Sequence, residues 1–227
     1  MKNILIVAAH PDDEVLGAGG AISHHSRSGD RVTIAILGEG ITSRSVSRDQ
    51  ADGSQLADLA LDAKKAAAIM GCHDVRLIGL PDNRFDSLNL LDVVKVVEKL
   101  VEELRPEVVY THHHGDLNQD HTVTARAVLT ACRPLPGQSV RKIYSFEVPS
   151  STGWGFPETP FVPNVFLDIS ATIQAKADAM SAYRSELRPY PHPRAPEALI
   201  ERAKAWGSHV GMMAAEPFFL LRELIQR

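Results

Sequence analysis

The sequence predicts an α/β fold, a Rossmann-like and mostly parallel sheet with helices on both faces. Two observations lead to this prediction. Apolar runs of strand length alternate with stretches of helical periodicity through the first half of the chain. The 227 residues, 44% hydrophobic and 23% charged, match a single globular domain and exclude a disordered chain or a disulfide scaffold. Because crossovers between parallel strands are right-handed, the expected spatial order begins 3-2-1-4.

The elements of the first half follow from these patterns. Apolar runs rich in β-branched residues predict strands at 4–8, 32–37, 75–78 and 107–111. A first helix follows the first strand and contains His24 and His25. Residues 54–70 and 90–104 carry apolar side chains at helical spacing, and Gly71 and Pro106 mark their ends. These elements make residues 1–133 the core half of the sheet.

After Pro134 the alternation becomes irregular. We expect short strands at 141–146, 164–167 and 218–221, and helices at 170–184 and ending near residue 212. No internal repeat is present, so residues 1–227 are interpreted as one domain in which residues 134–227 form an extension that shapes the substrate pocket. The apolar run 218–221 suggests a homo-oligomer.

Charge and cysteine content limit the partners. Lys and Arg number 24 against 28 Asp and Glu, a net charge of -4, which leaves no basic excess for binding nucleic acid. No stretch of eighteen apolar residues predicts a membrane span, and residues 4–9 lack the length of a signal peptide. Two cysteines, Cys72 and Cys132, are expected to remain buried thiols. We therefore expect a cytoplasmic protein that acts on a small molecule.

Two polar clusters follow expected neighbouring strands. His10-Pro11-Asp12-Asp13-Glu14 comes after the first strand, and the His-rich segment 112–121 comes after the fourth. Together they supply five histidines and four aspartates to the crevice at the carboxyl edge of the sheet, where ligands bind in such folds. Imidazole and carboxylate are the ligands of a catalytic divalent metal, typically zinc with three protein ligands.

The spacing indicates which residues could bind the metal and which one could act as general base. His10 and Asp13 are three residues apart in a strand-to-helix turn, so both side chains can converge on one ion. Asp12 is then free to act as general base. We favour His121 as third ligand because it begins a helix, although spacing alone leaves His113 and His114 as alternatives.

These segments resemble a known family. Ala9-His10-Pro11-Asp12-Asp13-Glu14, followed by Gly17-Ala18-Gly19-Gly20, is similar to the opening signature of the LmbE-like (PIG-L) deacetylases. The second motif of that family is similar to His114-Gly115-Asp116-Leu117-Asn118-Gln119-Asp120-His121. The resemblance implies one Zn²⁺ per chain, or another divalent ion in its place. By matching position it implies the ligands His10, Asp13 and His121, with Asp12 as general base.

One position departs from the family pattern. Some members have a histidine three residues before the last ligand, and this chain has Asn118 there. An amide can donate a hydrogen bond to an oxyanion, but it cannot act as a general acid. His114, or one of its neighbours His112 and His113, is the alternative acid, and Asp120 is a candidate to orient it.

The resemblance also implies the reaction, which is hydrolysis of an N-acetyl group from an N-acetylglucosamine-type amino sugar conjugate, releasing acetate and a free amine. Candidate contacts to the rest of the substrate are Arg44, Arg48, His113 and His192.

Two alternatives stay open. The first is an amidase that cleaves a larger amide on a sugar conjugate. The second is a non-catalytic nucleotide-binding module on the same fold. The spacing of Gly17, Gly19 and Gly20 does not match the dinucleotide pattern Gly-x-Gly-x-x-Gly. Close packing of helix and sheet is the simpler interpretation of these glycines.

Overall fold

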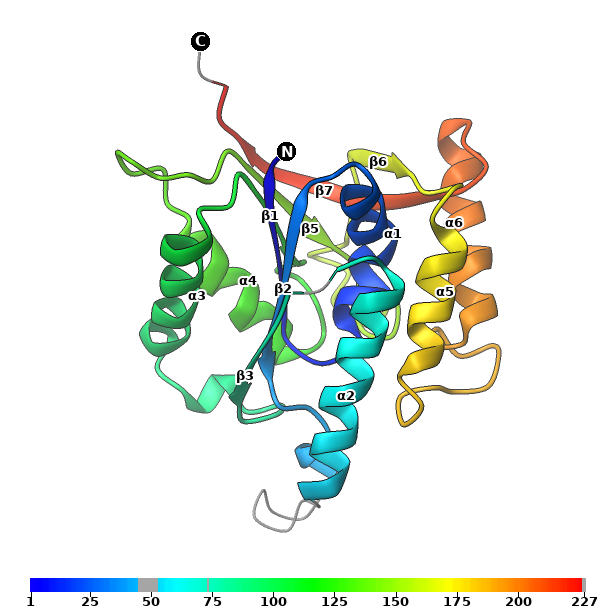
Figure 1. Cartoon of the computed structure of the whole chain (residues 1–227), viewed down its shortest axis with the longest axis horizontal. Helices are drawn as coiled ribbons and strands as arrows, with labels where there is room; N and C mark the ends of the chain where they lie inside the picture. Colours follow the sequence, from blue (N-terminus) through cyan, green and yellow to red (C-terminus); the bar gives the residue numbers. More distant parts are fainter. Residues whose placement is uncertain (45–52, 73, 226–227) are drawn as a thin grey trace.

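The protein is described by a computed structural model that covers residues 1–44, 53–72 and 74–225. Seven strands form one sheet in the order β3-β2-β1-β4-β5-β7-β6 (Figure 1). The predicted order 3-2-1-4 and the mostly parallel sheet are confirmed. β4 and β5 are also parallel, whereas β7 is antiparallel to both β5 and β6. The strand bounds are β1 Asn3–Ala8, β2 Arg31–Gly38, β3 Asp74–Leu80, β4 Val108–His112, β5 Lys142–Phe146, β6 Val165–Asp168 and β7 Ala215–Glu223.

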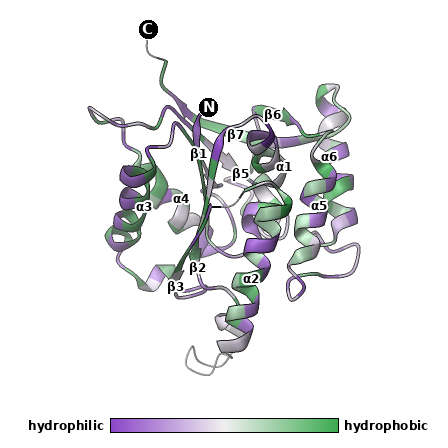
Figure 2. Cartoon of the chain, viewed as in Figure 1, coloured by the Kyte–Doolittle hydropathy of each residue, from purple (hydrophilic) through white to green (hydrophobic). Residues whose placement is uncertain are grey.

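Helices cover both faces of the sheet, as expected. One apolar cluster lies between the sheet and α3 and α4, and a second lies between the sheet and the other helices (Figure 1). Figure 2 shows that helices such as α2 and α3 carry both hydrophobic and hydrophilic residues, as partly buried helices do. No helix in the described ranges has the length and apolar composition to cross a bilayer. The helices are α1 Asp13–Arg27, α2 Gly53–Ile69, α3 Leu90–Leu104, α4 Gln119–Ala131, α5 Ile173–Ala182 and α6 Pro196–Val210, with 3-10 turns at Thr42–Arg44, Phe85–Ser87 and Thr152–Trp154.

The C-terminal half differs in detail from the prediction. α5 begins at Ile173 rather than 170, because the Ser170 hydroxyl donates to the Asp168 carboxylate instead of capping the helix. β7 is longer than predicted and lies between β5 and β6. Phe218, in its apolar run, is 1% exposed and belongs to the core. The sheet explains the burial of Phe218, whereas residues 219–221 are only partly buried, and the homo-oligomer stays a prediction.

The glycines of α1 allow it to lie close to the sheet, as the sequence predicts. A Cβ built at Gly17 would lie 2.1 Å from a ring carbon of Phe146 in β5. A Cβ at Gly20 would lie 2.5 Å from Ile169.

We expect Gly17→Ala to destabilise the protein by about 1–3 kcal/mol, because the fully buried Phe146 ring has to move. Chemical denaturation measures this, with Gly53→Ala as control, since nothing lies within 4 Å of a Cβ there. Equal stability of the two variants would contradict the packing role.

Candidate metal centre

The fold brings the two polar clusters together at the carboxyl edge of the sheet. β1 and β4 are parallel neighbours, so His10, just after β1, lies beside the segment that follows β4. β3 also contributes, because Asp82 follows its last residue, Leu80. A cavity of about 250 Å³ opens there. Its lining combines carboxylates, imidazoles and small polar side chains from both halves of the chain, among them His10, Asp13, Ser43, Asp82, Asn83, Asn118, His121, Ser151, Glu186 and Arg194.

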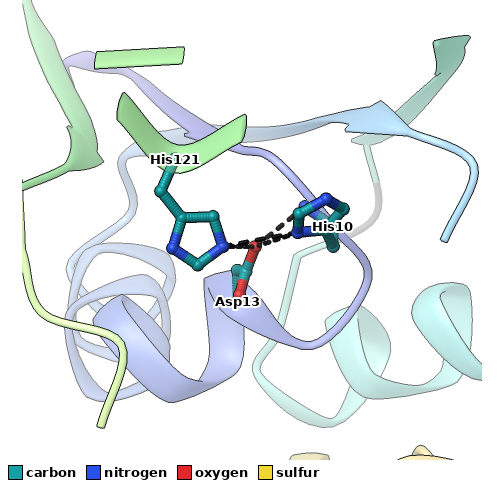
Figure 3. A group of neighbouring side chains, drawn as sticks. All are labelled: His10, Asp13 and His121. Atoms are coloured by element: carbon teal, nitrogen blue, oxygen red, sulfur yellow. Dashed lines mark hydrogen bonds and ion pairs between the residues drawn. The ribbon is translucent and has the colours of Figure 1, made fainter. Parts of the chain in front are cut away.

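Three side-chain atoms at this cavity form a nearly equilateral triangle (Figure 3). The His121 Nε2 atom lies 3.2 Å from Asp13 Oδ2 and 3.3 Å from His10 Nδ1, and His10 Nδ1 lies 3.4 Å from Asp13 Oδ2. Ligand atoms about 2.0–2.1 Å from a tetrahedral zinc ion lie roughly 3.3–3.4 Å from one another. The three residues predicted as ligands therefore fit one face of a tetrahedral metal site, and all three line the cavity.

Each histidine of the triangle contacts a second carboxylate through its other ring nitrogen. His10 Nε2 lies 2.9 Å from Asp120 Oδ2, and His121 Nδ1 lies 3.2 Å from Asp116 Oδ2. Such contacts fix which nitrogen carries the proton, so that Nδ1 of His10 and Nε2 of His121 are left for the metal. Asp120 thus orients His10, rather than a separate acid histidine as the sequence suggested.

Both outer carboxylates are themselves held in place. Asp120 is fully buried and accepts the backbone N–H of Phe85 at 2.9 Å. Asp116 accepts hydrogen bonds from the hydroxyls of Ser151 and Thr152 and from the backbone N–H of Asn118. Ser151 and Thr152 belong to the C-terminal half of the chain, which therefore supports the metal ligands of the N-terminal half.

The carboxylates around His10 and His121 favour positive charge at the site. Burial alone would lower the pKa of His10, but hydrogen bonds to Asp120 and Asp13 raise it to about 10. Burial likewise opposes the charged form of His121, but Asp13 and Asp116 raise its pKa to about 9. Burial would raise the pKa of Asp13, yet the charge of His121 and a hydrogen bond from His10 hold it well below its usual range. Without a metal, protons on the two imidazoles therefore supply the positive charge.

Protons should compete with the metal ion. At pH 7 both imidazoles are protonated on both ring nitrogens, and each must lose one proton before it can bind a metal ion. We therefore expect binding of one ion to release two protons. Metal affinity should then rise by about 100-fold per pH unit near pH 7. In the metal-free protein the raised pKa values stabilise the fold below pH 6.5, and that contribution is lost as the pH rises through 9 to 10. Calorimetry in buffers of different ionisation enthalpy counts the protons, and release of none would contradict this charge assignment.

Asp12 lies beside the triangle in an unusual conformation. It precedes α1 with φ of 96°, a left-handed conformation that is costly for a residue other than glycine. Its carboxylate is fully buried and does not line the cavity, whereas Arg194, which does, places Nε 2.8 Å from Asp12 Oδ2. The contact is an ion pair, since the Arg194 Nε–H bond is not directed at the carboxylate. Burial raises the pKa of Asp12 well above its usual range, although the charge of Arg194 opposes the shift.

The three consecutive histidines lie away from the cavity. His112 is fully buried, stacks on His121 at 4.0 Å, and accepts the backbone N–H of Ala9 on Nε2. Burial lowers the pKa of His112 well below its usual range, so its 3.6 Å approach to Asp13 is not an ion pair. His113 is buried against Phe161 and within 3.0 Å of the Thr159 carbonyl. His114 is exposed. The fold does not bring His113 or His114 to the cavity.

The remaining candidates are placed as follows. Asn118 lines the cavity, caps α4 by accepting the backbone N–H of Asp120, and donates its amide to Asn83. His192 lies near the cavity, two residues before Arg194, but is not part of its lining. The backbone of Arg44 ends the 3-10 turn Thr42–Arg44, while its side chain and all of Arg48 lie outside the described residues.

Several residues that line the cavity or contact its metal ligands were not predicted from the sequence. Asp82 could have been found, because it follows β3 as His10 follows β1. Asp116 lies inside the second motif, but nothing in the spacing distinguishes it from Asp120. Arg194 and Glu186 come from the loop between α5 and α6, from which only His192 was predicted as a substrate contact.

Comparisons with known proteins show which family the sequence resembles. The PIG-L family model, described as GlcNAc-PI de-N-acetylase, matches residues 5–132. The 1D-myo-inositol 2-acetamido-2-deoxy-alpha-D-glucopyranoside deacetylase of Rhodococcus erythropolis is 30% identical over 242 residues, which cover 82% of this chain and 81% of that protein. The probable N-acetyl-alpha-D-glucosaminyl L-malate deacetylase 2 of Bacillus cereus is 27% identical over 189 residues, which cover 82% of this chain and 84% of that protein.

Solved structures share the fold over the whole chain. The conserved protein TT1542 from Thermus thermophilus matches with a TM-score of 0.78 and 25% identity, covering 100% of this chain and 98% of that one. The 4-carboxy-2-hydroxymuconate hydratase GalB from Pseudomonas putida matches with a TM-score of 0.77 and 21% identity, covering 100% and 99%. Since one match is a hydratase, the fold by itself does not fix the reaction. The family model, which matches more than half of the chain, does fix the lineage: this chain belongs to the PIG-L family of de-N-acetylases.

Proposed function

We propose that this protein is a metal-dependent N-deacetylase that hydrolyses the acetamide of an N-acetylglucosamine-type conjugate to acetate and a free amine. The observation that carries the proposal is the triangle of His10, Asp13 and His121 at the wall of a polar cavity. The sequence relatives that are named as deacetylases of acetamido sugars support the choice of bond.

Zinc is the proposed ion, at one per chain, with another divalent ion as the alternative. Two imidazole nitrogens and one carboxylate oxygen are a common protein ligand set for catalytic zinc. A bound divalent ion of this kind polarises a carbonyl group and lowers the pKa of a water molecule. Asp116 and Asp120 would hold the two imidazoles in the ligating orientation.

The proposed general base is Asp12. It neighbours the ligand Asp13, and its Oδ1 atom has no hydrogen-bond partner among the described residues. Asn118 cannot give up a proton, and Asp12 is the neighbour of the ligand Asp13, so we assign the acid step to Asp12 as well. The proton that the Asp12 carboxylate takes from water then passes to the nitrogen of the departing amine as the C–N bond breaks.

The amide of Asn118 is the proposed contact for the substrate carbonyl or its oxyanion. Asn118 lines the cavity, and its Nδ2 donates to Asn83 Oδ1 at 3.0 Å. The amide has a second N–H, which is the proposed donor to the substrate. His192, Arg44 and Arg48 are kept as proposed contacts for the part of the conjugate beyond the amino sugar.

The proposal extends to the organisation and location of the protein. Residues 134–227 are proposed to complete the substrate pocket, and the cavity lining that Ser151, Glu186 and Arg194 provide supports this. A cytoplasmic location is proposed because Cys72 and Cys132 are both buried free thiols.

Acetate release is the direct test. The purified protein, reconstituted with Zn²⁺, Mn²⁺ or Co²⁺, is incubated with N-acetylglucosamine linked to inositol, to malate and to a second sugar, and acetate and new amine are measured. We expect equimolar acetate and amine from at least one conjugate, and loss of both after chelation. Release of a larger acid from N-acyl analogues, without acetate from any conjugate, would favour the amidase alternative instead.

A further inference from the structure

The loop between α5 and α6 inserts one guanidinium group next to Asp12. Arg194 lies 182 positions after Asp12 in the sequence, yet its Nε atom is 2.8 Å from Asp12 Oδ2. The other contact of this guanidinium is Glu186, where Nη1 lies 3.6 Å from Oε2. The Arg194 side chain is 25% exposed and lines the cavity, so it stands at the surface a substrate would meet.

The same part of the chain also fixes the backbone of Asp12. The hydroxyl of Tyr183, just after α5, donates to Glu14 Oε1 at 2.6 Å. The second oxygen of Glu14 accepts the backbone N–H of Asp12 at 3.1 Å. Tyr183 and Glu14 are buried, so this connection is shielded from water. It holds a residue whose φ of 96° would otherwise relax toward a more favourable region.

Arg194 determines which carboxylate oxygen is left for chemistry. Neither oxygen of Asp12 has a hydrogen-bond partner in the described part of the chain, but Oδ2 has the ion-pair contact with the guanidinium and Oδ1 has none. An unpaired carboxylate can rotate, so either oxygen could turn toward the cavity. With Oδ2 held, one orientation is selected.

We propose that Arg194 is a positioning residue, which holds the carboxylate of Asp12 through Oδ2 so that Oδ1 is presented for proton transfer. The inference rests on the proposed role of Asp12 as base. It assigns to the loop between α5 and α6 a part in turnover that is distinct from binding the metal or the sugar. This ion pair also gives the Arg194 guanidinium a role in a cavity lined by several carboxylates, where its ion-pair partners among the described residues are Asp12 and Glu186 and not the metal ligands.

Chemical rescue is the sharpest test, because a small cation can replace the missing group. In Arg194→Ala we expect kcat to fall by about 100-fold, the loss typical of a misplaced reacting group, with KM changed less than threefold and metal content unchanged. Guanidinium ion at concentrations well below those that unfold the protein should restore kcat by at least tenfold. The kcat of Arg194→Lys, which keeps the charge, should lie between the kcat of the wild type and that of Arg194→Ala. Arg188→Ala is the matched control, since among the described residues the Arg188 side chain donates to the loop carbonyls of Ser185 and Leu187, and it should retain wild-type kinetics.

Three outcomes would overturn the proposal. An increase in KM at constant kcat would make Arg194 a substrate contact. A higher kcat in Arg194→Ala would make it an inhibitory cover over Asp12. A loss of kcat that neither guanidinium nor Arg194→Lys recovers would make the residue merely structural.

A readout without substrate separates this inference from the assignment of the reaction. Thermal unfolding of wild type, Arg194→Met, Asp12→Asn and the double variant forms a double-mutant cycle. We expect the double variant to be more stable than the sum of the single changes predicts, because Arg194→Met leaves the buried Asp12 carboxylate without its partner and Asp12→Asn leaves Arg194 with Glu186 alone. Additive changes would contradict the pairing even if the protein released acetate. An inactive wild type with a coupled cycle would reject the reaction but keep the pairing.

Discussion

Asp12→Asn should bind one metal ion per chain with unchanged affinity and yet lose about 10²–10⁴-fold in kcat, the range expected when a general base is removed. The metal is retained because the ligand triangle uses Asp13 and the two histidines and does not include Asp12. Turnover is lost because an amide has nearly the shape of a carboxylate but cannot accept the proton. Metal analysis and steady-state kinetics on the same preparation separate the two effects.

The control for this prediction is Asp58→Asn, the same chemical change at an exposed residue of α2, which should alter neither quantity. Parallel loss of metal and activity in Asp12→Asn would show instead that Asp12 ligates the ion and that Asp13 takes its place as base. A fully active Asp12→Asn would remove Asp12 from the mechanism.

The metal ligands could be predicted from sequence because they depend on local rules. The order of strands β1 and β4 follows from right-handed crossovers, and parallel neighbours end at the same edge. His10 and Asp13 are close in the chain, so one turn brings both to the ion. His121 lies in the first turn of α4, where a helix fixes its direction. The placement of these three ligands therefore depends little on packing against residues from the C-terminal half of the chain.

The residues that surround the ligands were harder to predict, because their positions depend on long-range packing. Arg194 reaches Asp12 because α5 packs against α1, α6 packs against α5, and the loop between α5 and α6 contributes Arg194 to the cavity lining. The consecutive histidines were proposed as acids with the strand expected to end at residue 111. In the structure β4 extends to His112. That strand end buries His112 under His121 and directs the next residues away from the cavity.

Removal of the third ligand should have the most severe effect on the metal. His121→Ala is expected to reduce bound metal from one ion per chain to almost none at micromolar concentration, with activity falling to the level of the chelated wild type. The reason is that Asp13 and His10 alone offer two ligand atoms, and the stacked His112 cannot substitute because its Nε2 is committed to the backbone N–H of Ala9.

A graded series makes the His121 prediction specific to ligation. Asp116→Asn leaves the imidazole in place and removes only the carboxylate behind it, so metal affinity should weaken by about 10–100-fold, less than in His121→Ala. His24→Ala deletes an exposed imidazole of α1 and should bind metal as the wild type does. If His121→Ala and Asp116→Asn lost the same affinity, the imidazole would add nothing beyond its carboxylate partner. The ligand set would then have to be sought in the second group at this edge, His10 with Asp82 and Asp120.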